Sequence, residues 1–153
     1  MIKKFRNKYF PLTKNEERAL ISKYEKKRDN RVKKQILSYL NEDHGIIIAK
    51  NGKTKQIIEE IVARVNSGHL RTFRDIESYL TGISKHRKEH VVSALTVLVK
   101  SDILDYNCRL TIEYSRKNGE ECKRKIVNCF ANKLLENGID AKSKDVEKVF
   151  FSA

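Results

Sequence analysis

The chain has 153 residues, with 33 Lys and Arg against 20 Asp and Glu, which gives a formal net charge of +13 at pH 7. This length fits one domain or one domain with an appendage, and the excess positive charge favours a polyanionic partner such as nucleic acid. No apolar run approaches the ~18–20 residues that a membrane span requires, and MIKKFRNKYF has no stretch typical of a signal peptide. We therefore expect a soluble cytoplasmic protein with no membrane partner.

Residues 1–50 are predicted to form a basic arm followed by a helical extension. The positive charge is concentrated here, because residues 1–55 hold 16 basic and 6 acidic residues, a net charge of +10. Thr13 and Glu16 have capping-box spacing and predict a helix to about residue 27. The aliphatic spacing in VKKQILSYL predicts a second helix over roughly residues 30–41. GIIIAKNGK, which follows, is interpreted as a short strand and a turn.

Three helices are predicted between residues 54 and 100. TKQIIEEIVARVN places its aliphatic residues on one helical face, and TFRD, at residues 72–75, begins the second helix with a cap-like Thr. The third helix follows the turn TGIS, with Ser84 as the expected N-cap, and runs to about Lys100. Its expected buried stripe consists of Val91, Val92, Leu95, Leu98 and Val99.

This N-cap places a cluster of cations, KHRKEH, in the first turns of the third helix. A helix N-terminus carries partial positive charge, so each exposed cation there costs about 0.3–1 kcal/mol. Glu89 is the one residue of the cluster with the favoured sign. Such an arrangement indicates that the cations serve a negatively charged partner.

Residues 108–129 change period and predict a β-hairpin. CRLTIEYSRKNGEECKRKIVNC contains two alternating runs around Asn118–Gly119, which favours a two-residue type I′ turn. Counting outward from this turn places Leu110 opposite Val127. It also places Cys108 opposite Cys129, as a small apolar pair or, alternatively, a cross-strand disulfide. The remaining segments, FANKLLENG and SKDVEKVFF, predict one or two short helices.

The order of helix, short extended piece, helix, turn, helix and hairpin over residues 54–130 resembles the winged helix-turn-helix family. The resemblance is carried by TFRDIESYLTGISKHRKEHVVSALTVLVKSDILDY and the hairpin that follows it. It implies an α+β, mainly helical fold, with an N-terminal helical extension over residues 1–50, a winged domain over residues 51–130 and a C-terminal helical tail over residues 131–153.

The resemblance further implies sequence-specific binding to double-stranded DNA, as in a transcription regulator, with localisation to the nucleoid. The third helix would read the major groove and the hairpin would contact a neighbouring groove or the backbone. The implied DNA-binding residues are Arg71, Arg74, Ser84, Lys85, His86, Arg87, Lys88, His90, Arg116, Lys117, Asn118, Lys123 and Arg124.

Three alternatives stay open. The winged domain could be a protein-interaction module in a replication or transcription assembly that binds nucleic acid without sequence preference. The aromatic residues of the N-terminal arm, Phe5, Tyr9 and Phe10, could instead stack on unpaired bases of RNA. A homodimer would allow two recognition helices to read a palindrome.

Neither enzymatic activity nor a cofactor is expected from the sequence. The chain has no P-loop, no HExxH and no GxSxG motif. His86 and His90 have the i, i+4 spacing of metal ligands, but no third ligand lies nearby in the sequence, so no metal site is expected.

Overall fold

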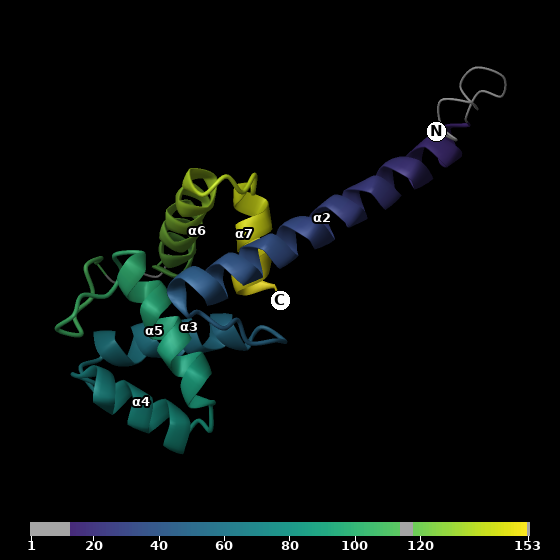
Figure 1. Cartoon of the computed structure of the whole chain (residues 1–153). Coiled ribbons are helices and arrows are strands. Elements are labelled where there is room, and N and C mark those ends of the chain that lie inside the picture. The colour runs from purple at the N-terminus through teal and green to yellow at the C-terminus, as the bar shows by residue number, and fades with distance from the viewer. Residues whose placement is uncertain (1–12, 114–117, 153) are drawn as a thin grey trace.

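The computed structural model describes residues 13–113 and 118–152, and its regular elements in those ranges are all helices (Figure 1). The helices are α2 (Lys14–His44), α3 (Lys53–Asn66), α4 (Phe73–Gly82), α5 (Lys88–Lys100), α6 (Asn118–Glu136) and α7 (Ser143–Phe151). Within the described ranges, the β pairing consists of a single antiparallel bridge between Leu104 and Leu110. The expected α+β winged fold is therefore wrong. None of these helices has the length and apolar composition needed to cross a membrane.

Helix α2 is one continuous helix, although two were expected over its length. No glycine or proline interrupts residues 14–44, so the backbone hydrogen bonds continue through the expected break near Asn30. Thr13 caps the helix as expected, because its side chain accepts the Glu16 N–H at 3.1 Å. Gly45, with φ of 65°, ends it in the left-handed conformation that glycine adopts without strain. In Figure 1 the N-terminal half of α2 projects away from the other helices.

Helices α3 and α4 form where the sequence predicts them, but α5 begins later. Thr72 caps α4 by accepting the Asp75 N–H at 3.1 Å. Arg87, and not Ser84, is the N-cap of α5. The intervening turn is held by carbonyls of α4, because Leu80 accepts the His86 N–H at 2.8 Å. The expectation that the whole KHRKEH cluster lies in helical turns is therefore wrong.

In the described part of residues 108–129, the expected hairpin is replaced by a loop over residues 108–113 and by α6 from Asn118 onward. Asn118 and Gly119, taken as a type I′ turn, lie at the beginning of this helix. Glu120 and Glu121 occupy its first turn, where the helix dipole favours acidic side chains. Four of the buried side chains of α6 follow one helical face at four-residue spacing, namely Cys122, Ile126, Phe130 and Leu134, and Val127 is buried beside them. This spacing over 13 residues fits a helix better than two alternating strands.

The cross-strand pairs fail together with the hairpin. Cys108 lies in the loop before α6, and its thiol and those of Cys122 and Cys129 are free. The Cys129 Sγ instead donates to the Lys100 carbonyl oxygen at 3.2 Å, which places the C-terminal end of α5 beside α6. Residues 45–49 form no strand and pair with no described strand, so the expected short strand is also wrong.

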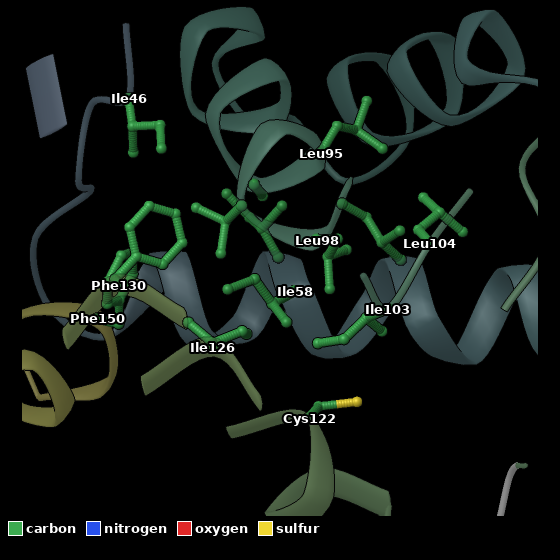
Figure 2. Packing of buried hydrophobic residues seen from close by; sticks show 14 of the residues in the cluster. Ile46, Ile58, Leu95, Leu98, Ile103, Leu104, Cys122, Ile126, Phe130 and Phe150 are labelled. Atoms are coloured by element: carbon green, nitrogen blue, oxygen red, sulfur yellow. The ribbon is translucent and has the colours of Figure 1, made fainter. Parts of the chain in front are cut away.

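The core lies between α3, α4, α5, α6 and α7, with the C-terminal half of α2 packed against it. Figure 2 shows Ile58 of α3 between Leu98 of α5 and Ile126 of α6. The rings of Phe130 and Phe150 lie with their centroids 5.1 Å apart and join α6 to α7. Fully burying a side chain of this size stabilises a fold by about 1.5–3 kcal/mol. This core fixes the relative positions of α3 and α5, whose N-termini flank the site described next.

Candidate nucleic-acid interface

A basic cleft of about 540 Å³ lies between the loop before α3 and the turn before α5. We call it the basic cleft throughout. Its lining consists of Ile48, Ala49, Lys50, Asn51, Lys53, Lys85, His86, Arg87 and His90. None of these described lining residues is acidic, although Glu89 lies 3.3 Å from the Arg87 guanidinium and Glu60 lies 3.1 Å from the His86 ring. Two basic segments more than 30 residues apart in the sequence therefore meet at one surface.

The loop before α3 is held in place by side-chain hydrogen bonds from the helices on either side. Ser93 of α5 accepts the Ile47 N–H at 2.9 Å, and Thr54 of α3 accepts the Ala49 N–H at 2.8 Å. Ser93 and Thr54 are buried although both are polar. Because buried hydroxyls that satisfy backbone donors fix a loop conformation, Lys50 and Lys53 are presented from a rigid support.

The turn before α5 is attached to α3 by His86. Its Nε2 lies 3.1 Å from a carboxylate oxygen of Glu60, and its side chain is only 8% exposed. His86 was expected to contact DNA, but this contact and its burial give it a structural role at the base of the cleft. Lys85 and Arg87, on either side of it in the sequence, are exposed.

The N-termini of α3 and α5 at the cleft differ from those of α2 and α4. In residues 13–113, Thr13 and Thr72 cap α2 and α4 with side-chain oxygens, whereas Gly52 and Arg87 make no such bond at α3 and α5. The first backbone N–H groups of a helix point outward and carry partial positive charge. Two such ends therefore add to the field of the lysines in the cleft.

Two residues of the cleft hold left-handed backbone conformations. Asn51 has φ of 61° and Lys85 has φ of 55°. For a side chain such as lysine this conformation is uncommon, and strained residues persist only where the surrounding structure holds them. The contacts of His86 and Thr54 supply that support on the two sides of the cleft.

The remaining expected DNA-binding residues lie elsewhere. Arg71 and Arg74 are exposed around the start of α4, and Ser84 is half-buried in the turn. Arg116 and Lys117 fall outside the described residues, and Asn118 begins α6. Lys123 and Arg124 lie on α6, where Lys123 pairs with Glu147 of α7 at 2.6 Å. Because the hairpin is absent from the described ranges, these α6 residues do not form a wing beside α5.

Sequence reasoning did not select Lys50 and Lys53 as site residues. Both flank the Asn51–Gly52 turn that precedes α3, and from the sequence this stretch is interpreted only as a short strand and a turn. The available signal was a lysine on each side of an Asn-Gly turn directly before a helix with no acidic residue in its first turn. That pattern marks a helix start suited to an anion.

The outer face of α5 beyond the cleft is apolar. Val92, expected in the buried stripe, is 38% exposed, and Val99 is half-buried. They line a groove of about 280 Å³ between α4, α5 and the loop that carries Tyr106. We call this the α5 groove; its lining residues are Phe73, Glu77, Val92, Leu95, Thr96, Val99, Lys100 and Tyr106.

Metal and thiol chemistry have little support in the described ranges. No three His, Cys, Asp or Glu side chains in residues 13–113 and 118–152 lie close enough to hold a metal ion. Burial raises the pKa of the Cys108 and Cys122 thiols, which disfavours the reactive thiolate. The basic cleft and the α5 groove are therefore the features from which function is argued.

Comparison with protein-family models, curated proteins and solved structures finds no match to this chain.

Proposed function

We propose that the protein binds nucleic acid and that the basic cleft contacts the phosphate backbone. One observation carries the proposal: Lys50 and Lys53 converge with Lys85, Arg87 and His90 on one surface that contains no acidic lining residue among those described. The core holds this cluster together at the cost of electrostatic repulsion between like charges. A bound polyanion removes that repulsion.

The chemistry of the cleft suits phosphate more than a single small anion. Its cations come from two segments and are spread over about 540 Å³, so they can neutralise successive phosphates of one strand. The net charge of +13 adds a long-range field that attracts a polyanion before contact. Binding of this kind releases counterions and weakens steeply as salt is added.

Sequence-specific binding to double-stranded DNA is a second candidate. Arg87 and Lys88 favour it, because they are exposed at the beginning of α5 after a short turn from α4, where a recognition helix presents base-reading side chains. Arginine and lysine are also the residues that read guanine in the major groove. Farther along α5, Val92 and Val99 offer no donor for base edges, so specificity would depend on the first turn alone.

The test compares two pairs of lysines with the same total charge. Lys50→Gln with Lys85→Gln removes two cations from the cleft, whereas Lys26→Gln with Lys27→Gln removes two exposed cations from α2. The measured quantity is the slope of log Kd against log salt concentration for mixed-sequence DNA, which we call the salt slope. We expect the cleft pair to lower this slope by the amount that corresponds to about two phosphate contacts, and the α2 pair to lower it much less. Fluorescence titration between about 50 and 200 mM salt measures both slopes.

Two results would contradict the proposal. A wild-type affinity that does not change with salt would exclude phosphate contacts altogether. Equal slopes for the two double variants would show that overall charge, and not the basic cleft, attracts the nucleic acid.

A further inference from the structure

The α5 groove is continuous with the basic cleft. A shallow hollow beside the start of α5 is lined by residues that include Ile47, Arg87, Lys88 and Val92. Arg87 also lines the basic cleft, and Val92 also lines the α5 groove. A ligand bound along α5 would therefore pass from the cations of the cleft to the apolar groove within about five residues, or about 7.5 Å along the helix axis.

Cations lie at both ends of this path, and a mostly apolar section lies between them. Arg87 and Lys88 stand at the cleft end of the groove, and Lys100 lines its far end. Between them the lining is mostly apolar and includes Glu77, which would repel a phosphate placed there. Glu89 also lines the hollow at the cleft end, where it pairs with Arg87 at 3.3 Å, so Lys88 is the cation there without a carboxylate partner among the described residues. Lys88 and Lys100 are 12 residues apart in α5, or about 18 Å along the helix axis. Phosphates several nucleotides apart in one strand, with uncharged bases between them, would match this spacing.

Tyr106 adds an aromatic surface to the same groove. Its side chain is 82% exposed, which is unusual for a large ring and incompatible with a role in the core. The loop that carries it is nevertheless held in place, because the Asp105 carboxylate accepts the backbone N–H groups of Asn107 and Arg109 at 2.9 Å. The ring is thus displayed from a fixed loop at the rim of the groove.

We propose that the α5 groove takes an unpaired base of a single strand, which stacks on Tyr106 while phosphates farther along the strand on its two sides contact Arg87 and Lys88 at one end of the groove and Lys100 at the other. The inference rests on the proposed function and names its substrate class. A groove of about 280 Å³ lies just below the range that drug-sized ligands occupy, so it suits one planar base. Bases inside a duplex are paired and stacked, and their faces are not accessible to such a groove.

The expected gain from the base is measurable. Stacking of one base on an aromatic side chain is worth about 1–3 kcal/mol, which corresponds to a change in affinity of about 5-fold to 150-fold. An abasic strand keeps every phosphate and loses every base. The ratio of its Kd to that of the intact strand therefore isolates the contribution of the bases from the contribution of the cleft.

The experiment measures this ratio for a short single-stranded DNA of mixed sequence in four proteins. We expect a ratio of about ten or more for the wild type. Tyr106→Ala should bring the ratio close to one without changing the Kd of the abasic strand. Tyr106→Phe, which keeps the ring, and Tyr24→Ala, which removes another exposed tyrosine on α2, should both keep the wild-type ratio. Because Tyr106 is exposed, all four proteins should melt at similar temperatures.

A second variant and a second ligand make the test decisive. Thr96→Phe fills the α5 groove from its lining and should lower the ratio as Tyr106→Ala does. The wild type should also bind the single strand more tightly than the matching duplex. A wild-type ratio near one, or a ratio that Tyr106→Ala leaves unchanged, would overturn the inference. In that case the proposed function would still stand, provided that Lys50→Gln with Lys85→Gln weakens binding of the abasic strand. If this double variant leaves binding of the abasic strand unchanged, the proposed function itself fails.

Discussion

Helices α5 and α7 begin with opposite electrostatic arrangements. At the start of α7, the Asp145 carboxylate accepts the backbone N–H three residues before it at 2.8 Å, and Arg28 of α2 donates to both carboxylate oxygens at 3.2 and 3.1 Å. At the start of α5, Arg87 and Lys88 occupy positions where negative charge is favoured. Glu89 pairs there with Arg87 at 3.3 Å, but both side chains are largely exposed.

The difference separates a helix start that serves the fold from one that serves a partner. Asp145 is buried, satisfies the α7 dipole and joins α7 to α2, so its whole interaction is made within the protein. The start of α5 lacks that compensation and lies at the basic cleft. We therefore expect substitutions at α7 to change stability, and substitutions at α5 to change binding.

The largest expected effect is a loss of stability in Asp145→Ala. The change removes a helix-start acceptor and leaves Arg28 with the Asp29 carboxylate, 3.2 Å away, as its remaining ion-pair partner. Because Arg28 can regain water at its exposed side, we expect a loss of about 2–3 kcal/mol in the free energy of unfolding, below the ~3–5 kcal/mol typical of a fully buried pair. Denaturant unfolding measures it.

Glu89→Ala is the matched control, since it removes an acidic residue from the first turn of α5. Its exposed carboxylate should contribute no more than about 1 kcal/mol. Equal losses in the two variants would show that the two helix starts do not differ as proposed.

The contribution of Asp145 should also depend on pH. Burial by itself would raise the pKa of Asp145, but hydrogen bonds from Arg28 and from the Lys142 backbone outweigh it and hold the pKa below its ordinary value. A carboxyl whose pKa is lowered by folding stabilises the protein above its unfolded pKa, and this contribution is lost as pH falls through the folded pKa. The difference in unfolding free energy between wild type and Asp145→Asn should therefore be constant above about pH 5 and shrink in acid. A difference that grows on acidification would contradict the ion pair.

The smallest expected effect on stability is in Lys88→Ala. Removing a cation from the start of α5 should leave the protein as stable as before or stabilise it by up to about 1 kcal/mol. The same change should lower the salt slope of nucleic-acid binding by about one phosphate contact. Lys34→Ala, an exposed position on α2, should lower the slope less. Lost stability with an unchanged slope would mean that Lys88 packs within the protein.

The sequence predicts those parts of the molecule whose structure depends on neighbouring residues. The aliphatic spacing of α3 and the Thr72 cap of α4 are local signals, and both predictions are confirmed. For α6, the Asn118–Gly119 dipeptide favours a hairpin, whereas the four-residue spacing from Cys122 to Leu134 favours a helix. That spacing extends over several turns and is the stronger signal.

The candidate site was harder to predict from the sequence, because it depends on contacts between residues that are distant in the chain. The start of α5 is set by His86, which reaches Glu60 26 positions earlier, and no periodic pattern indicates such a contact. The meeting of Lys50 with Lys85 likewise depends on how α3 packs against α5. The charge pattern of the sequence indicates the cations before and at the start of α5. Their proximity to Lys50 and Lys53 follows only from the packing of the helices.

The exposed N-terminal part of α2 should make the chain sensitive to proteases. Residues 14–27 contribute no buried side chain, whereas Ile36 and Leu40 are completely enclosed. The outer turns can therefore open by local fraying, and their amide hydrogens should exchange with solvent far faster than those near Leu40, which wait for global unfolding. Among the described residues, a trypsin-like protease should cut in this exposed part of α2, at Lys14, Arg18, Lys23, Lys26 or Lys27, before it cuts near Leu40. Such a cut would separate the most N-terminal part of the chain and leave α3 to α7 folded.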